Sequence, residues 1–426
     1  MTTNQSVGLT AEPGIRPTIG DKAGAMEPGS IASRKQGSMA LVLAALCAIG
    51  PLGIDMYLPS IPDMAVSFGA AEGAVQFSLM TFFVGLMLGQ LAYGPLSDKF
   101  GRKPMIYLGI AVFMAGSIGC ALAQSVQQLQ ALRFVQGLGG SIGMVIAFAV
   151  VKDVFSGAAM GRMMSLILAV LGLSPVVAPM VGNVLQGLGS WRAIFWALTV
   201  YGALTALAIA LLLPETRSAA DRKGFALSRT LHNYRKILCD GKFIPFALAL
   251  CIGQAGFFAY IAGSASVFIS QYALTPTQFS LLFGVNALGL MAAAILNPRL
   301  HRRVGALKAF RLVNSAYLVV LLLLMVYLLG GYSNLFVLSA GFFATVSLLG
   351  FIMPTGSQLA LMQQREHAGT ASALLGSMQF GAGAIVTGIS GAMAFLGGIG
   401  LVLVMLACAA IAAVMCWTVV PRKMDL

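Results

Sequence analysis

The stretch MALVLAALCAIGPLGIDMY, residues 39–57, is an apolar run interrupted by a single charged residue, Asp55. A helix needs about 20 mostly apolar residues to cross the hydrocarbon core of a bilayer, and this run has that length. A charge near the bilayer centre costs about 2.5 to 3.5 kcal/mol on insertion scales, so it normally persists where function requires it. The run therefore predicts a membrane span whose carboxylate has a functional role.

A second charge, Arg133, lies within the apolar stretch from Leu129 to Val151. Asp55 and Arg133 are the only charged residues away from the ends of the long apolar segments. Because both are costly in a membrane, they form a candidate pair. A membrane carboxylate with a cationic partner suggests proton-coupled transport.

The rest of the chain is equally suited to lipid. Hydrophobic residues make up 58% of it, charged residues only 9%, and its mean hydropathy is +0.89. A soluble domain carries about 25% charged residues. The pattern predicts an all-α integral membrane protein with twelve spans in two groups of six: 39–58, 76–96, 105–123, 129–151, 163–187, 192–213, then 244–269, 277–297, 308–329, 334–360, 368–395 and 397–419.

The net charge of +13 raises the question of a nucleic-acid partner, but the distribution of charge answers it. With a cytoplasmic N-terminus, all 26 Lys and Arg residues except Arg133 and Arg192 fall in tails and loops on the cytoplasmic side. This asymmetry is what the positive-inside rule predicts. It places both termini in the cytoplasm, and no nucleic acid is needed to explain it.

Cysteine and histidine usage argues against a disulfide-stapled protein and against a metalloprotein. Only Cys239 falls outside the apolar spans, so no disulfide framework is implied. The three histidines, His232, His301 and His367, lie in separate cytoplasmic loops. We therefore expect no metal site and no cofactor, and the spans lack a catalytic cluster that an enzyme would need.

Composition also divides the chain. Residues 1–38 are rich in Gly, Ser, Thr, Pro and Ala and lack the apolar core of a signal peptide, so we expect a disordered cytoplasmic tail. Residues 214–243 form the longest and most charged cytoplasmic loop, typical of a linker. The predicted bundles are then residues 39–213 and 244–420, with a short cytoplasmic tail at 421–426.

An internal repeat supports two bundles. GPLSDKFGRK, residues 94–103, follows the second span, and PRLHRRVGAL, residues 298–307, follows the eighth. The constant offset of 204 residues aligns Gly101 with Gly305, although Arg302 replaces Asp98. Parallel repeats of six spans are the architecture in which a substrate site lies at the midplane between two rocking halves.

These motifs resemble a known family. GPLSDKFGRKP is similar to the cytoplasmic signature of the major facilitator superfamily, G-x-L-x-D-[RK]-x-G-R-[RK], which it matches at every specified position. Four further segments resemble the bicyclomycin-resistance (Bcr/CflA) branch of the drug:proton antiporters: IDMYLPSIP (54–62), RFVQGLGG (133–140), YIAGSASVFISQYALTPTQFSLLFGVNALGL (260–290) and AGTASALLGSMQFGAGAIV (368–386). The resemblance covers everything but the N-terminal tail.

The resemblance implies an inner-membrane protein of bacteria that exports small amphipathic molecules, such as bicyclomycin-like or phenicol-like drugs, by alternating access. Its partners would be the substrate, protons and the lipid bilayer, its energy source the proton gradient, and its expected state a monomer. One alternative is the export of an endogenous metabolite, such as a nucleoside, amino-acid derivative or sugar. A membrane sensor or scaffold is the alternative from another class, but no large soluble region is present.

The signature loop has a physical interpretation. Gly94 and Gly101 permit tight turns where two spans reverse. Asp98 can cap or bond an opposed helix end, and Arg102 can pair with Asp153 at the cytoplasmic end of the fourth span. The resemblance implies that this loop locks and releases a cytoplasmic gate. The alternative is a positively charged anchor that only fixes topology.

Asp55 lies near the outer end of the first span, four residues before Pro59, which can open the helix and admit water. It is a candidate for the group that titrates or senses substrate, and the alternative is a helix-end cap that never changes protonation. Some relatives carry another carboxylate two turns earlier on this helix, where this chain has Cys47. That departure favours neutral or weakly polar drugs over electrogenic export of cations.

Arg133 shares one helix face with Gln136, Gly137 and Gly140, at spacings of three, four and seven residues. Such a face is polar at one end and allows close backbone contact along the rest. The resemblance implies that Arg133 takes part in proton coupling by acting on an acid across the cavity. The alternative is a structural arginine that reaches toward the outer headgroups.

The fifth span carries a face similar to the antiporter signature G-x-x-x-G-P-x-x-G-G: Gly172, Pro175, Pro179 and Gly182. The match is partial, since Ala178 and Asn183 stand at two glycine positions. Small residues and prolines are common in membrane helices, so ordinary packing is an equal alternative. We interpret this face, and the row Ala373, Ser377 and Gly381 in the eleventh span, as helix contacts that must slide.

Candidate substrate-contacting residues are the few uncharged polar and aromatic groups in the spans that line the cavity in this superfamily. Polar groups are costly against lipid, so most should face the interior. Which of them touch substrate and which only join helices stays open. They are Tyr57, Gln136, Gln254, Tyr260, Asn286 and Gln379.

Overall fold

The structure is a computed structural model that describes residues 33–217, 227–362, 364 and 368–421. Every regular element in these ranges is helical. Twelve helical segments are long and apolar enough to cross a membrane, which confirms the predicted number. The predicted disordered tail is, up to residue 32, outside the described residues, as is part of the predicted linker at 218–226.

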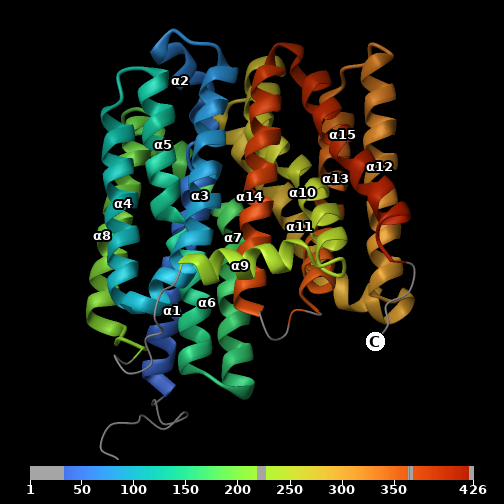
Figure 1. Ribbon diagram of the computed structural model, residues 1–426. Helices are drawn as coiled ribbons and strands as arrows, with labels where there is room; N and C mark the ends of the chain where they lie inside the picture. Colours follow the sequence, from blue (N-terminus) through green and yellow to red (C-terminus); the bar gives the residue numbers. More distant parts are fainter. Residues whose placement is uncertain (1–32, 218–226, 363, 365–367, 422–426) are drawn as a thin grey trace, which may run out of the picture.

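The first bundle holds six spans (Figure 1). Its first span is interrupted after Asp55 by a turn and a short 3-10 helix. The elements are α1 (Ser33–Asp55), η1 (Leu58–Ser60), α2 (Ile61–Phe68), α3 (Glu72–Phe100), α4 (Arg102–Leu122), α5 (Val126–Gly140), α6 (Ile142–Val154), α7 (Gly157–Gly187) and α8 (Arg192–Leu212).

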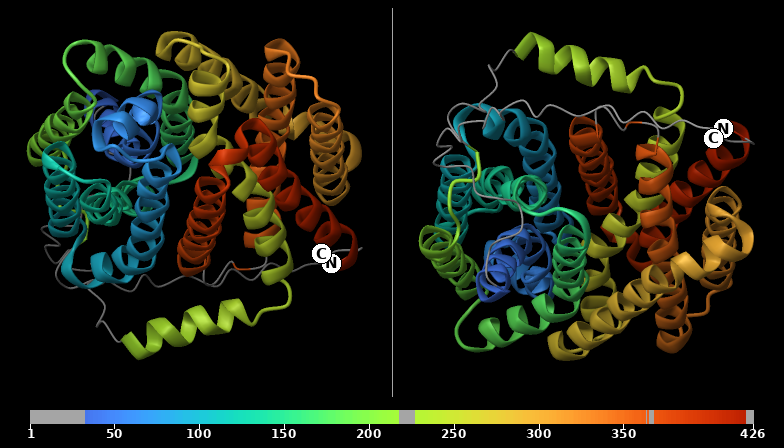
Figure 2. Two further views of the ribbon diagram at one scale, coloured as in Figure 1. Left: turned by 90° about the horizontal axis from the view of Figure 1, so that it is seen from above. Right: turned by 90° about the horizontal axis from the view of Figure 1, so that it is seen from below.

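A separate helix, α9 (Leu227–Leu238), connects this bundle to the second and lies crosswise to the spans (Figures 1 and 2). The second bundle again holds six spans. Its elements are α10 (Ile244–Ala265), the π-helix η3 (Ser266–Gln271), α11 (Pro276–Val304), α12 (Ala306–Leu329), α13 (Leu335–Leu361), α14 (Ala368–Ala392), η4 (Ala394–Leu396) and α15 (Gly397–Thr418).

The sequence repeat corresponds to a structural one. Helices α3 and α11 are each 29 residues long and are displaced by the same 204 residues as the motifs that end them. Gly101 and Gly305 both have positive φ, 99° and 81°, which glycine adopts without a Cβ clash. The backbone N–H of Gly101 donates to the backbone carbonyl of Ser97, and that of Gly305 donates to the backbone carbonyl of His301. Each bond caps the preceding helix.

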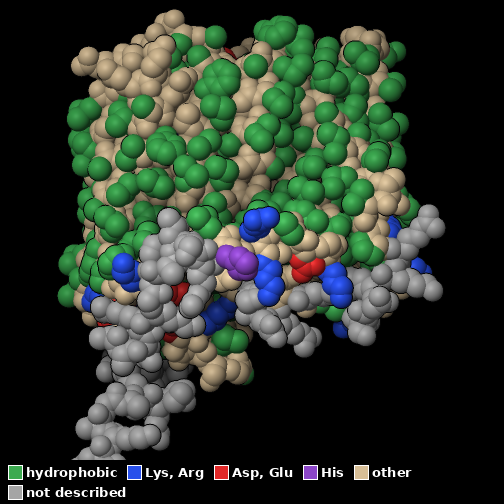
Figure 3. Space-filling view, viewed as in Figure 1, with side chains coloured by type: hydrophobic (Ala, Val, Ile, Leu, Met, Phe, Trp, Pro, Cys, Tyr) green, Lys and Arg blue, Asp and Glu red, His purple; other side chains and the backbone are tan. Residues whose placement is uncertain are grey.

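Charge separates the two ends of the molecule. Figure 3 shows a broad hydrophobic band above a rim of Lys and Arg side chains. We call the end with this rim, where α1 begins and α15 ends, the basic face, and the other end the opposite face. Large apolar side chains such as Leu211 and Val326 are exposed within the band, as expected for helices against lipid. The chain is therefore a multi-pass membrane protein.

Three local features differ from the sequence expectation. Helix α1 begins at Ser33, so the expected tail boundary at residue 38 lies inside a helix. The fourth span is divided at Ser141, beside closely packed glycines. The linker contains helix α9, which its polar composition did not predict.

The bundles meet along two seams, α3 against α14 and α7 against α11. Small residues allow the first seam to close. Gly381 and Gly388 of α14 lie against the sulfur atoms of Met87 and Met80 of α3, respectively, and the hydroxyl of Ser377 donates to the carbonyl of Met87 (3.0 Å). A Cβ at either glycine would meet only the end of a methionine side chain, which can move, whereas a Cβ on Gly73 of α3 would overlap the backbone carbonyl of Gly391 of α14, so this contact needs a glycine.

Candidate functional site

Asp55 is the last residue of α1, and its side chain is 3% exposed. Pro51 lies one turn earlier, and beyond Asp55 the chain leaves the α-helical path before η1. The carboxylate makes no hydrogen bond or ion pair with any described residue. A buried carboxylate normally has a partner, so an unpartnered one is a candidate for a group that changes protonation during function.

Arg133, on α5, is completely buried and is bonded to the same turn of α1. Its Nη1 donates to the carbonyl of Gly53 (2.9 Å), two residues before Asp55, and to Oε1 of Gln136 (2.5 Å). The amide Nε2 of Gln136 in turn donates to Ser117 of α4 (2.8 Å). Both polar atoms of Gln136 are thus used inside the first bundle, where they orient the arginine.

Aromatic rings complete the surroundings of Arg133. Its guanidinium lies 4.3 Å from the ring centre of Tyr57 and 4.2 Å from that of Phe82, distances at which a cation is attracted to a ring face. No ion pair joins it to Asp55 within the described chain, and its Nε and Nη2 have no hydrogen-bond partner there. The arginine therefore holds two unused donors beside the turn that carries the carboxylate.

The second bundle places two further candidates in contact. Asn286 of α11 donates from Nδ2 to the hydroxyl of Tyr260 on α10 (2.5 Å), whose ring stacks on Phe283 at 5.6 Å. The amide oxygens of Asn286 and of Gln254 are buried without a partner among the described residues. Gln379 of α14 is half-buried. The unused oxygens of Asn286 and Gln254 are hydrogen-bond acceptors on α11 and α10, respectively.

A cluster of phenylalanines links the two bundles. Phe83 of α3 lies 4.7 Å from Phe258 of α10 and 6.0 Å from Phe380 of α14, measured between ring centres. Its neighbour Phe82 is the ring that contacts Arg133. The sequence prediction missed these residues because phenylalanine is common throughout the spans, and consecutive phenylalanines such as Phe82 and Phe83 also occur at 257–258 and 342–343.

The signature loop forms an ionic network at the basic face. Arg102 is nearly buried and pairs with Asp98 (3.0 Å) and with Asp153 of α6 (2.9 Å), so the predicted pair of Arg102 with Asp153 is present. Its Nη1 also donates to Ser97 (2.6 Å). The tight turn predicted at Gly94 is wrong, because Gly94 lies inside α3, one helical turn before the network, where its carbonyl accepts the Ser97 hydroxyl.

Two residues of the linker join this network and were not predicted. The carboxylate of Glu215 accepts the backbone N–H groups of Arg102 (3.0 Å) and Lys103 (3.1 Å), which are the first residues of α4. An anion at this place satisfies free amides and complements the helix dipole. Arg217 pairs with Asp98 (2.9 Å). The contacts described here all lie within the first bundle and its linker.

The antiporter-like face of α7 touches both α1 and the second bundle. A Cβ on Gly182 would overlap the carbonyl oxygen of Met56, directly after Asp55. The carbonyl of Pro179 accepts a hydrogen bond from Ser280 of α11 (3.2 Å), and Gly172 lies beside Met291 of α11. Pro175 is half-buried on the same helix.

Side-chain hydrogen bonds join the bundles near the opposite face, and sequence reasoning did not find them. Gln76 of α3 donates to Ser266 (2.9 Å), and Ser270 donates to Glu72 (2.5 Å). Glu72 and Gln76 are four residues apart on α3, and Ser266 and Ser270 are four residues apart on the π-helix η3. Asn183 of α7 adds a bond to Thr277 of α11 (2.9 Å). We call these three bonds the opposite-face latch.

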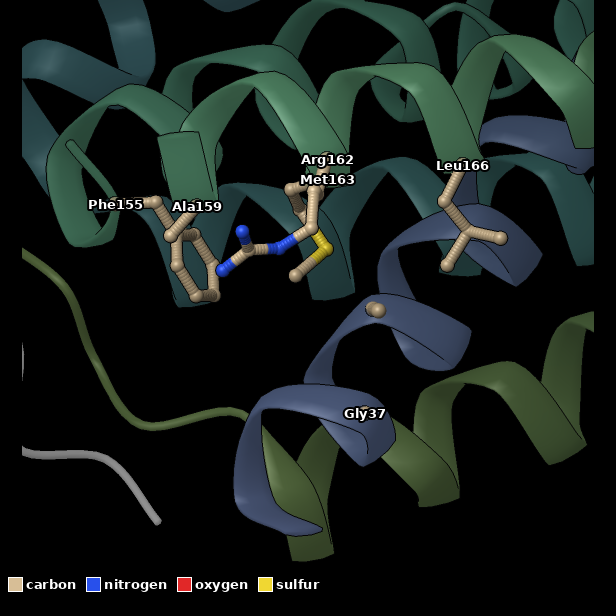
Figure 4. Close-up of a pocket in the computed structure, with 7 residues that line it drawn as sticks. Gly37, Phe155, Ala159, Arg162, Met163 and Leu166 are labelled. Atoms are coloured by element: carbon tan, nitrogen blue, oxygen red, sulfur yellow. The ribbon is translucent and has the colours of Figure 1, made fainter. Parts of the chain in front are cut away.

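A small pocket of about 210 Å³ lies at the basic face between α1 and α7, apart from the predicted substrate residues (Figure 4). Apolar groups dominate its wall, and Arg162 supplies its one charged side chain. The lining residues are Gly37, Ala40, Phe155, Ala159, Arg162, Met163 and Leu166.

Twelve membrane helices in two related bundles, with an ionic signature loop after the second span, define a membrane transporter and not an enzyme. The sequence profile of the Major Facilitator Superfamily matches residues 41–388, so the chain belongs to that superfamily. The partially occluded inward-open xylose transporter XylE from Escherichia coli has the same fold, with a TM-score of 0.72. The superposition covers 92% of this chain and 100% of that one at 13% identity.

Sequence relatives confirm the resemblance to drug exporters. The chain is 31% identical over 354 residues to the bicyclomycin resistance protein homolog of Haemophilus influenzae, covering 83% of this chain and 88% of that protein. It is 29% identical over 316 residues to the chloramphenicol resistance protein of Pseudomonas aeruginosa, covering 74% and 71%, respectively.

Proposed function

We propose that this chain exports small amphipathic drugs, of the bicyclomycin or phenicol kind, across the bacterial inner membrane in exchange for protons. The observation that carries the proposal is the buried carboxylate of Asp55, which has no partner among the described residues and lies at the end of α1, two residues after the Gly53 carbonyl that Arg133 bonds. The names of the relatives supply the substrate class. The basic face would be cytoplasmic, together with both termini.

In this mechanism Asp55 takes up a proton from one side and releases it to the other. The two unused donors of Arg133 attract the carboxylate when it is ionised, and the attraction weakens when it is protonated. Because Arg133 of α5 also bonds the Gly53 carbonyl of α1, a change at Asp55 would be transmitted from the end of α1 to α5. Asp55, Arg133 and Tyr57 would then carry the coupling, with Gln136 holding the arginine.

The substrate would lie against the second-bundle wall of Tyr260, Asn286, Gln254 and Gln379 and the phenylalanine cluster. Its unused amide oxygens accept hydrogen bonds from hydroxyl or amide groups, and its rings provide soft apolar contact. Within the described part of these helices the wall carries no charge, which suits a neutral drug. The predicted neutral preference thus remains part of the proposal.

Alternating access requires gates at both ends. The opposite-face latch joins the bundles in this conformation, so the structure corresponds to a state closed on that side. We assign the loop from Gly94 to Lys103, with Asp153, as the part that stabilises the cytoplasmic ends of the first bundle as they move. The seam glycines and the α7 face are the surfaces that slide.

The driving force is sufficient. A proton moving under about 150 mV releases roughly 3.5 kcal/mol, and each 1.4 kcal/mol corresponds to a tenfold concentration ratio. One proton could therefore support about a 300-fold gradient of a neutral drug, so a single carboxylate is enough and no cofactor is required.

The deciding measurement is proton release from proteoliposomes when bicyclomycin or a phenicol is added, in wild type and in Asp55→Asn. We expect release with wild type and none with Asp55→Asn. Asp63→Asn is the matched control, because Asp63 is an exposed acid that bonds Gln186 near the opposite face, and it should behave as wild type.

The same assay separates the alternatives. Release with a nucleoside, an amino-acid derivative or a sugar, but with neither drug, would make the chain a metabolite exporter. If no compound moves protons through wild type, antiport is wrong and a sensor becomes the better explanation. If Asp55→Asn transports as wild type does, Asp55 is structural.

A further inference from the structure

One edge of helix α9 packs against the described residues of the bundles, and the edge beside it is exposed. Tyr234 and Ile237 are buried, at 8% and 1% exposure, and face the bundles. The hydroxyl of Tyr234 donates to the carbonyl of Leu91 on α3 (3.0 Å). Burial raises the pKa of this phenol to about 12, so it remains a donor at any physiological pH.

The neighbouring edge of the helix is exposed, with apolar residues next to Tyr234 and cations further round. Leu231 and Leu238 flank Tyr234 at spacings of three and four residues, and they are 57% and 41% exposed. Arg235 and Lys236 follow further round the helix, are exposed, and make no hydrogen bond or ion pair with any described residue. Exposed leucines beside exposed cations are the pattern of a helix that lies in a membrane interface.

The position of α9 fits that pattern. It lies at the level of the basic face, crosswise to the spans, and outside the outline of the two bundles (Figures 1 and 2). From this place its leucines can extend toward the acyl chains while its cations reach the lipid headgroups. A soluble protein partner would have to compete with the bilayer for this edge.

We propose that the exposed edge of α9, formed by Leu231, Leu238, Arg235 and Lys236, binds the anionic headgroup layer of the membrane. Each Lys or Arg near an anionic surface contributes favourably, while the leucines enter the boundary with the acyl chains. The occupant is therefore acidic phospholipid.

The helix is tied to both bundles, so its attachment affects them both. Tyr234 bonds α3 of the first bundle, and α9 packs against α14 of the second. Just beyond its end, Asp240 accepts a hydrogen bond from Gln364, which lies between α13 and α14. Lipid that holds α9 would thus act at the seam between α3 and α14, on the side where the bundles must separate.

A spin label at Leu231→Cys in the full-length protein tests the proposal. Cys239 is replaced by serine, since it is the exposed cysteine of the described chain and the others are buried. We expect the label to become severalfold less accessible to a water-soluble nickel reagent when phosphatidylglycerol is added to phosphatidylcholine vesicles. Molar salt should reverse the change, because it screens exposed charges.

Three variants make the result specific. The change should be lost in Arg235→Gln with Lys236→Gln and kept in Arg235→Lys, which preserves the charge. It should also be kept in Arg302→Gln with Arg303→Gln, an exposed pair on the same face at the end of α11.

Equal accessibility in both kinds of vesicle would overturn the proposal, as would an equal loss in the Arg302 and Arg303 control. If inorganic phosphate added to phosphatidylcholine vesicles produces the same protection, the cations bind a soluble anion and the lipid proposal fails. None of these readouts depends on transport, so they stand apart from a failure of the proposed function.

Discussion

At the scale of single residues, Arg133 is a buried cation that is hydrogen-bonded through Nη1, while Nε and Nη2 have no partner among the described residues. Its charge is tolerated because two rings and two oxygen acceptors surround it, while two of its donors stay free. This is a costly arrangement for a residue that serves packing alone. It is better explained by a transient partner, and Asp55, two residues after the bonded Gly53, is our candidate.

We expect Gln136→Leu to destabilise the protein, because it removes the acceptor that Arg133 uses at 2.5 Å. Leaving a buried charged donor without its partner costs about 1 to 3 kcal/mol. The unfolding temperature of the purified protein in detergent measures the effect. Gln127→Leu, an exposed position on the same helix, should leave it unchanged; equal effects would mean that Gln136 does not hold the arginine.

Gly182→Ala should block transport, because its Cβ would meet the backbone carbonyl of Met56 and force α7 away from the end of α1. Backbone cannot yield as a flexible side chain does. Gly187→Ala on the same helix meets no atom within 4 Å and is the control. Drug-driven proton release compares the two, and a fully active Gly182→Ala would show that this contact is dispensable.

At the scale of elements, the loop between α3 and α4 could be read well from sequence and the linker could not. The charges and glycines of residues 94–103 predicted the Arg102–Asp153 pair, because each lies at a helix end. Nothing local indicated that Glu215 and Arg217 would return to cap α4 and pair with Asp98. Such long-range pairing depends on where α8 ends in space.

Substitutions of Arg102 and Asp153, which belong to one ionic network, should have non-additive effects on transport. We expect Arg102→Ala and Asp153→Asn each to lower drug-driven proton release severalfold, and the double variant to be no worse than the more damaging single one. Residues of one ionic network give non-additive effects. Lys152→Ala, an exposed neighbour with no described partner, is the control. Additive losses would mean that the two residues act separately.

At the scale of the whole molecule, the twelve spans and their division into two bundles followed from hydropathy and from the repeat. The helix faces that form the seams did not, since apolar residues surround most spans on every side. Asn286 and Tyr260 were both named as cavity residues, but their direct bond required the tertiary structure. The opposite-face latch, built of common polar residues, gave no signal at all.

Cross-linking the latch should stop transport by holding the bundles together. In a Cys239→Ser background, Gln76→Cys with Ser266→Cys, joined by a short bis-methanethiosulfonate, should lose drug-driven proton release and regain it after reduction. The control pair is Asp63→Cys with Gln186→Cys, whose native side chains are bonded within the first bundle. A cross-linked Gln76 and Ser266 pair that still transports would exclude movement at this end.

The hydrogen bonds of the opposite-face latch differ in their sensitivity to external pH and salt. If the opposite face meets the exterior, its closure rests on amide and hydroxyl groups, and Glu72 alone among the six side chains is ionisable. Acid or brine outside the cell would leave the Gln76–Ser266 and Asn183–Thr277 bonds almost unchanged, because neither pair carries charge. These two bonds would then hold this face closed over a range of external pH and salt, while the protonation of Asp55 responds to the acidity that drives export.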